Sequence, residues 1–175
     1  MSHVKRTRQG IRVKLVAEEV ELLRALVGQL LALLGDSPRG DDELAALGIA
    51  ENATTPEDPV LARLFPDAYR DDGEAAGEFR RYTEMGLRDG KRESAESVLA
   101  SLKDPKADVV LDEEQARMWL RTLNDIRLAV GTRLEITEEW YEEAGSMSPD
   151  DPRAPMFAAY DWLTMLQESL VRALW

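Results

Sequence analysis

The sequence of 175 residues contains no cysteine and only one histidine, His3. Disulfides and thiolate metal sites are therefore excluded, and the lack of cysteine agrees with a reducing compartment. His3, the third residue of the sequence, is the only histidine that could serve as a metal ligand or a general base. We therefore expect no histidine-based metal site and no histidine-based catalysis.

Long apolar runs and common catalytic motifs are also missing. The most apolar stretch, residues 22–34, is interrupted by Arg24 and Gln29, so it resembles neither a membrane span nor a secretory signal. We find no glycine-rich phosphate loop, no serine nucleophile elbow and no Glu-x-x-His pattern of di-iron bundles. We therefore expect a cytoplasmic protein that is not an enzyme, with no catalytic residues, no cofactor-binding residues, no metal ligands and no cofactor.

Charge is distributed unevenly along the chain, whose net charge is −12. Residues 1–16 contain no acidic side chain but five basic ones, namely Lys5, Arg6, Arg8, Arg12 and Lys14. These five of the 22 basic residues leave 17 basic against 34 acidic residues in 17–175, a net charge of −17. A body this acidic repels nucleic-acid phosphates and anionic lipid surfaces. We therefore expect no membrane partner, and we disfavour a nucleic-acid partner.

The apolar pattern predicts a mainly α (α+β) protein, with a helical bundle and a small two- or three-stranded sheet in a single domain, residues 1–175. Alternating apolar and basic residues predict a hairpin within 3–15, and a β-branched run predicts a strand at 107–111. Residues 36–58 are predicted to form a loop with one short helical piece around 44–49. Apolar residues at helical spacing predict the main helices, over residues 17–34, 58–70 (ended by Pro66), 72–102, 112–134, 137–143 and 154–173.

Two strand–helix units give a weak internal repeat. Residues 13–15 lead into the sequence LLRAL at 22–26, and residues 109–111 lead into WLRTL at 119–123. This pattern predicts that the two strands pair beside the helices. The helix predicted at 17–34 is apolar on most sides, so we expect it to be buried between layers. Polar residues fill 88–94, where we expect a kink or a projecting segment.

The predicted helix 112–134 carries polar residues where a core helix normally has none. Asp112 is suited to cap its first turn. Asn124, Arg127 and Gly131 share one stripe, and glycine inside a helix costs about 1 kcal/mol relative to alanine, so a close helix crossing is expected at Gly131. The polar residues either bond to neighbouring segments or line a binding pocket.

The last predicted helix has a second stripe of large side chains beside its main apolar face. Aromatic and methionine residues are enriched at protein interfaces, although such stripes also occur in cores. Trp162 and Met165 belong to this second stripe, and Tyr160 belongs to the main apolar face. With the polar residues of the central helix, they give the candidate pocket or interface residues, which are Asn124, Arg127, Arg133, Tyr160, Trp162 and Met165.

Four blocks of the sequence resemble an uncharacterised actinobacterial family that is described as a domain of unknown function. Genes of this family often lie near the gene for the substrate adaptor of the Clp protease, and some members bear the label of transcriptional regulator. The resemblance implies no established activity and no site residues. The blocks are DPVLARLFPDAYRDD (58–72), EFRRYTEMGLR (78–88), LDEEQARMWLRTLNDIRLAVGTRL (111–134) and YDWLTMLQESLVRAL (160–174).

Three functional hypotheses follow. The first is a non-catalytic protein-interaction or accessory module that binds a protein partner or a second copy of itself, with a link to cytoplasmic protein quality control. The second is a nucleic-acid-linked regulator that uses the basic N-terminal segment. The third is a small-molecule sensor whose pocket requires Asn124, Arg127 and Tyr160 to converge.

Overall fold

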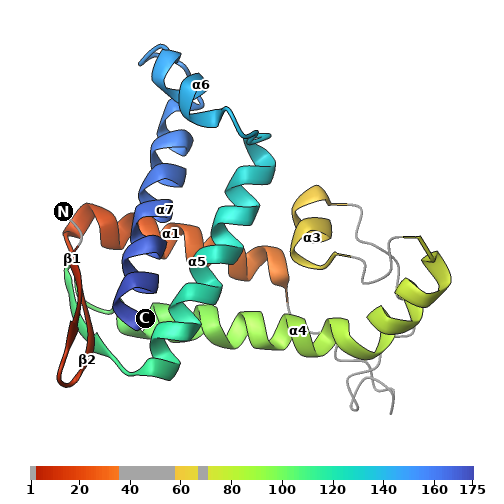
Figure 1. Cartoon of the computed structure of the whole chain (residues 1–175), viewed down its shortest axis with the longest axis horizontal. Helices are drawn as coiled ribbons and strands as arrows, with labels where there is room; N and C mark the ends of the chain where they lie inside the picture. Colours follow the sequence, from red (N-terminus) through yellow and green to blue (C-terminus); the bar gives the residue numbers. More distant parts are fainter. Residues whose placement is uncertain (1–2, 36–57, 67–70) are drawn as a thin grey trace.

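A three-stranded antiparallel sheet joins the N-terminal hairpin to a strand from the middle of the chain in the computed structural model, which describes residues 3–35, 58–66 and 71–175 (Figure 1). The strands are β1 His3–Thr7, β2 Gly10–Leu15 and β3 Ala107–Leu111, in the order β1-β2-β3. In the centre of the sheet, Val13 is paired with Val4 on one side and Val109 on the other. The predicted small sheet is confirmed and has three strands.

Helices make up most of the remaining described chain, which confirms the mainly α class. Their bounds agree closely with the predicted ranges, except that the short helix expected at 137–143 begins and ends three residues later. They are α1 Ala17–Leu34, α3 Pro59–Leu64, α4 Gly73–Ser101, α5 Glu113–Arg133, α6 Trp140–Ser146 and α7 Ala154–Leu174. The helical piece expected at 44–49 lies outside the described residues. Within the described ranges, no helix is both long and apolar enough to cross a membrane.

The two predicted strand–helix units are present and their strands pair. β2 leads into α1 and β3 into α5, and Ile11 of β2 lies opposite Leu111 of β3. Both helices begin with the same device: the Glu19 carboxylate accepts from the Val16 N–H at 3.0 Å, and the Gln115 side chain accepts from the Asp112 N–H at 2.9 Å. These bonds satisfy donors that a helix start leaves without partners.

The core forms around α5, which contacts α1, α3, α4 and α7. Figure 1 shows α7 on one side of α5, α3 on the other, and α6 joining the ends of α5 and α7. Trp119 and Leu123 of α5 are fully buried with Leu23 of α1 and Leu163 of α7. α1 is buried or half-buried over most of its surface, as expected. Its outer side, which includes Ala32, is exposed, because small and polar residues interrupt the leucines there.

Arginines from neighbouring elements bind the carboxyl ends of three helices. Arg88 and Arg92 of α4 donate to the Leu34 and Gly35 carbonyls at the end of α1. In the reverse direction Arg24 of α1 donates to the Leu102 carbonyl after α4, and Arg6 of β1 donates to the Leu174 carbonyl at 3.1 Å. These last carbonyls carry partial negative charge and lack partners within their own helix.

Residues 88–94 do not interrupt the helix, although a kink or a projecting segment was predicted there. α4 is one continuous helix from Gly73 to Ser101, with no projecting segment. Its polar middle contains Arg88 and Arg92, which reach α1, and Lys91, which reaches α5. The stretch is polar because its cations are needed between helices.

Candidate functional site

Arg127 of α5 is held by three side chains of α7. Its Nε donates to Thr164 Oγ1 at 3.1 Å, its Nη1 to Gln167 Oε1 at 2.8 Å, and its Nη2 to the Tyr160 hydroxyl at 3.4 Å. The guanidinium carbon also lies 5.3 Å from the centre of the Tyr160 ring. Arg127 and Tyr160 therefore meet as predicted. Because three of its N–H groups bind side chains of α7, Arg127 acts as a cross-link between the helices.

The ring of Tyr160 also packs against Gly131, where a close helix crossing was predicted. A Cβ atom placed on Gly131 would lie 3.4 Å from Tyr160 Cε2 and 3.7 Å from Ile136. The Tyr160 ring also meets Trp140 edge to face, with 5.0 Å between ring centres. Tyr160 thus links α5, α6 and α7.

Replacing Arg127 with methionine is expected to lower the free energy of unfolding by about 1–2 kcal/mol, because part-buried partners on α7 lose their donors. Urea denaturation followed by circular dichroism measures this change. Arg121→Met is the matched control, since Arg121 is exposed on the same helix. An equal effect of both substitutions would show that the cross-link contributes nothing.

Asn124 lies elsewhere, which corrects the predicted three-residue pocket. Asn124 is exposed and lines a hollow of about 360 Å³ between α4 and α5. Seven residues span about 10 Å along a helix, so one stripe of α5 meets α7 at Gly131 but borders this hollow at Asn124. The convergence of Asn124, Arg127 and Tyr160 that the sensor hypothesis requires is therefore not formed.

The hollow beside Asn124 contains a buried ion pair that the sequence did not identify as a pair. Lys91 Nζ lies 2.7 Å from Asp125 Oδ1, and the Asp125 side chain is only 4% exposed. Burial raises the pKa of Asp125, and the hydrogen bond and charge of Lys91 oppose this rise. Two features of the sequence could have indicated this pair. Asp125 interrupts the apolar pattern of α5, and α4 contains a run of basic residues that includes Lys91.

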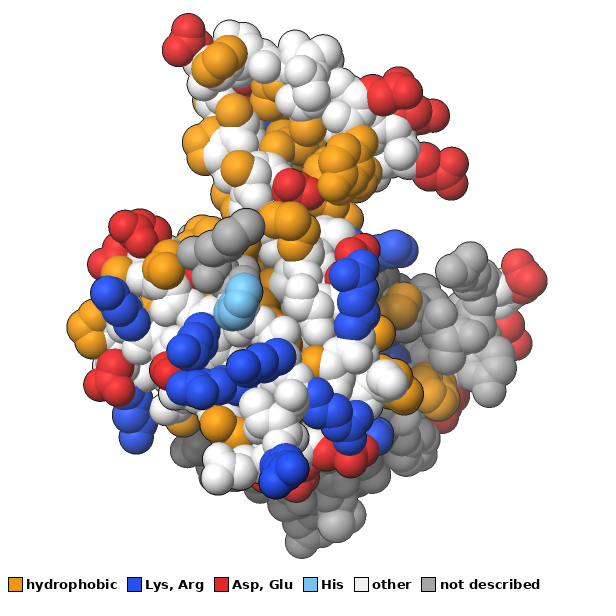
Figure 2. All heavy atoms as spheres, turned by 60° about the vertical axis from the view of Figure 1, so that its left-hand side comes forward, with side chains coloured by type: hydrophobic (Ala, Val, Ile, Leu, Met, Phe, Trp, Pro, Cys, Tyr) orange, Lys and Arg blue, Asp and Glu red, His pale blue; other side chains and the backbone are white. Residues whose placement is uncertain are grey.

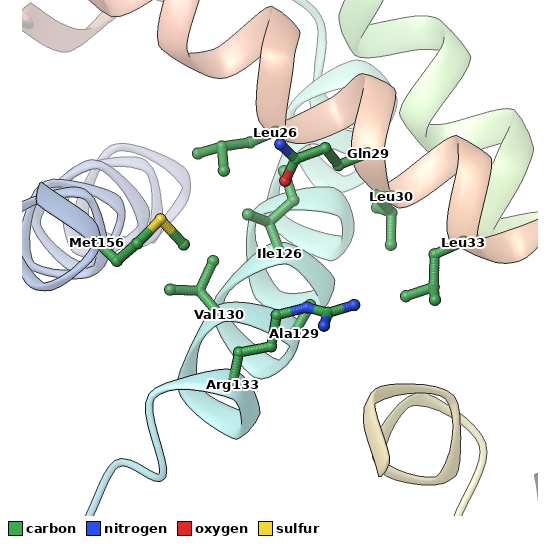
Figure 3. A pocket seen from close by; sticks show the side chains of 9 residues that line it. All are labelled: Leu26, Gln29, Leu30, Leu33, Ile126, Ala129, Val130, Arg133 and Met156. Atoms are coloured by element: carbon green, nitrogen blue, oxygen red, sulfur yellow. The ribbon is translucent and has the colours of Figure 1, made fainter. Parts of the chain in front are cut away.

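Arg133 borders a small apolar cavity between α1, α5 and α7. The cavity measures about 60 Å³, far below the roughly 300 Å³ at which ligand pockets begin. In Figure 3 the side chains of Leu30, Val130 and Met156 surround it, with Gln29 and Arg133 as its polar members. This volume suits a gap in side-chain packing better than a cofactor.

Trp162 and Met165 differ in their surroundings, although both were predicted in one stripe. The indole N–H of Trp162 donates to Glu19 Oε1 at 3.1 Å and joins α7 to the start of α1. Trp162 is half-buried, whereas Met165 is 53% exposed. Met165 therefore remains as an interface candidate, and Trp162 holds the fold together.

Three of the basic N-terminal residues, Lys5, Arg12 and Lys14, lie on one face of the sheet. Lys5 is paired with Arg12, and directly opposed residues of an antiparallel pair share a face. Lys14 follows Arg12 on that face, and Figure 2 shows basic side chains gathered on this side of the molecule. Asp108 of β3 binds Arg12 through two bonds of 2.7 Å, which lowers the pKa of Asp108. The positive face is therefore partly neutralised within the sheet.

Known proteins are similar to this chain over nearly its whole length. A family model described as a domain of unknown function, DUF2017, matches residues 1–174. An AosR protein of Mycobacterium leprae is 38% identical over 187 aligned residues, which cover 96% of this chain and 85% of that protein. The "Oxidative stress regulator AosR" proteins of Mycobacterium bovis and Mycobacterium tuberculosis are each 36% identical, over 96% of this chain and 84% of theirs. No solved structure matches this chain.

Proposed function

Because this chain belongs to the DUF2017 family, whose mycobacterial relatives include proteins named oxidative stress regulators, we propose that it is a regulatory protein that acts by binding a partner protein. Binding, without catalysis, is the mode of action in this proposal. The regulatory part is supported by the names of the relatives, and the binding part by the surface of α7.

The observation that carries the binding part is the exposure of large apolar side chains on the last helix. Met165 is 53% exposed, Val171 40% and the adjoining Trp175 79%. Methionine and aromatic residues are enriched at the centres of protein interfaces. A protein that covered this side of α7 would remove apolar area from water, and each Å² buried contributes about 25 cal/mol to the free energy of binding.

Replacing Met165 with glutamate is expected to reduce capture of the partner about tenfold or more, because burying an unpaired carboxylate costs at least as much as a hydrogen bond. The measurement is quantitative mass spectrometry of proteins retained from native lysate by the immobilised chain. Ala32→Glu on the exposed side of α1 adds the same charge away from α7. Retention of no specific protein, or equal retention by Met165→Glu and the wild type, would contradict the proposal.

The regulatory part has its own test, which compares transcripts of a deletion strain and its parent before and after peroxide treatment. We expect the response to differ and to be restored by the wild-type chain but not by Met165→Glu. An unchanged response would contradict a regulatory role in oxidative stress. Since the chain has no cysteine, any such response cannot begin with oxidation of a thiol of its own.

A narrower hypothesis places the protein in cytoplasmic protein quality control. It is supported by the gene neighbourhood that the family resemblance implies. If it holds, the protein retained in the capture experiment will be a component of the Clp system or one of its substrates.

The second candidate function is regulation through nucleic acid, and the basic face of the sheet favours it. Lys5 is exposed on that face beside Arg12. If this face binds DNA, Lys5→Gln is expected to weaken a mobility shift and to reduce its dependence on salt, because each phosphate contact releases counterions. A shift that is unchanged in Lys5→Gln would exclude this face.

A further inference from the structure

A second hollow, of about 340 Å³, lies between α6 and the first half of α7. Its volume is within the range of small-ligand pockets, which begin near roughly 300 Å³. The hollow belongs to the lobe that carries α6, at the top of Figures 1 and 2. Its polar and aromatic lining includes Trp140, Tyr141, Ser148, Phe157 and Asp161.

Aromatic rings form one wall of this hollow. The ring centres of Trp140 and Tyr141 are 4.2 Å apart, and Tyr141 is 64% exposed. Trp140 in turn packs against the Tyr160 ring in a T-shaped contact. This wall is therefore anchored on the Arg127 cross-link, although its open side faces solvent.

A carboxylate stands beside the rings. The Tyr141 hydroxyl donates to Asp161 Oδ1 at 3.0 Å, and this bond raises the pKa of Tyr141 and keeps the phenol neutral. Within the described part of the chain, Asp161 Oδ2 has no hydrogen-bond partner. The hollow thus combines aromatic faces, whose π electrons attract cations, with a carboxylate oxygen that accepts hydrogen bonds.

The surrounding segment is strongly acidic. Residues 135–153 contain seven acidic residues and one basic residue, Arg153. Figure 2 shows acidic side chains at the edges of this lobe with apolar side chains between them. Arg153 lies 5.9 Å from the centre of the Phe157 ring and pairs with Glu143 and Asp151. The lobe already accommodates an arginine between an aromatic ring and carboxylates.

We propose that the hollow between α6 and α7 binds an arginine side chain from a basic segment of a partner protein. The guanidinium plane stacks on the exposed Tyr141 ring and donates to Asp161, while the acidic rim attracts the flanking basic residues. The neutral phenol and the carboxylate disfavour an anionic ligand. The inference deepens the proposed partner-binding function and rests on it, since Asp161 lies one helical turn before Met165 on the same side of α7.

The test uses the full chain and two synthetic peptides, acetyl-Gly-Arg-Leu-Arg-Gly-amide and the same peptide with citrulline in place of each arginine. Citrulline keeps the size of arginine and removes its charge. Nuclear magnetic resonance follows the indole N–H signal of Trp140 during titration. We expect the arginine peptide to shift this signal in a saturable way and the citrulline peptide to leave it in place. An unmoved signal, or equal binding of both peptides, would overturn the proposal.

Two variants separate a specific site from general attraction to an acidic lobe. Asp161→Asn is expected to weaken the arginine peptide about tenfold, as loss of a charge-assisted hydrogen bond does. Asp150→Asn removes one charge from the same lobe outside the hollow and is expected to change affinity less than twofold. Equal weakening by the two variants would overturn the site. If Tyr141→Ala folds and still binds like the wild type, the stacking is also refuted.

Light scattering at the concentration of the titration distinguishes a second copy of the chain as the occupant. A dimer that disappears in Tyr141→Ala would assign the hollow to self-association and overturn binding of a partner's arginine. The capture experiment with Met165→Glu and the peptide titration of the wild type are separate measurements on neighbouring parts of α7. If the wild type retains a partner that Met165→Glu does not retain, but the wild type does not bind the peptide, only the arginine site is refuted. If the wild type binds the peptide but retains no partner, only the α7 surface is refuted.

Discussion

Replacing Lys91 with methionine is expected to lower the free energy of unfolding at pH 7 by about 3 kcal/mol, the lower end of the cost of breaking a buried ion pair. Asp125 would be left almost fully buried without its cation, since the Lys91 side chain is 21% and the Asp125 side chain 4% exposed. Methionine fills most of the volume of the lysine stem, so the loss reports mainly on charge. Chemical denaturation measures it.

The size of this loss is expected to depend on pH. Burial raises the pKa of Asp125 above its ordinary value of 3.8, and Lys91 partly counteracts the rise. A carboxyl whose pKa is higher in the folded state stabilises the fold below its unfolded pKa and loses that contribution as pH rises through the folded pKa. Without Lys91 the folded pKa rises further. The difference between the variant and the wild type should therefore be small near pH 4 and grow toward pH 7.

The double variant Lys91→Met/Asp125→Asn is the control for this interpretation. It removes the buried charge together with its partner, so most of the loss seen in Lys91→Met at pH 7 should be recovered. A double variant as unstable as the single one would mean that Lys91 acts through packing. A loss that does not change between pH 4 and pH 7 would contradict the assignment to Asp125.

Much of the fold follows from local patterns in the sequence. Alternating residues in 11–15 predicted β2, and the spacing of Leu120, Leu123 and Ile126 predicted α5, because each pattern places apolar side chains on one side of an element. The similarity of the two strand–helix units predicted that β2 and β3 pair. Each of these patterns can be recognised within one segment of the sequence, or by comparing two segments.

Contacts between distant segments were less predictable. The contact of Arg127 with Tyr160 joins residues 33 positions apart, and it was anticipated only within the sensor hypothesis, which placed Asn124 there as well. Asn124 was misplaced because a stripe of one helix does not show which neighbour covers each of its turns. The hollow at Tyr141 and Asp161 was not predicted at all. It depends on how the loop after α6 returns to α7, which no periodicity encodes.

Gly10→Ala is expected to lower the free energy of unfolding by about 2–4 kcal/mol, as the sum of backbone strain and overpacking. Gly10 begins β2 with φ of 139°, a conformation that side-chain-bearing residues rarely adopt. A Cβ atom there would also lie 2.3 Å from the Leu111 carbonyl oxygen, which is backbone and cannot rotate away. Because Asp112, the cap of α5, follows Leu111 directly, moving this carbonyl also disturbs the start of the central helix.

Gly28→Ala makes the same chemical change where the opposite result is expected. Gly28 lies inside α1, and a Cβ atom there would have nothing within 4 Å. Alanine in a helix is favoured over glycine by about 1 kcal/mol, so this variant should be more stable than the wild type. Thermal and urea denaturation of both variants measure the two signs. A Gly10→Ala protein as stable as Gly28→Ala would contradict the close approach of the hairpin to β3, and with it the position of the basic face relative to α5.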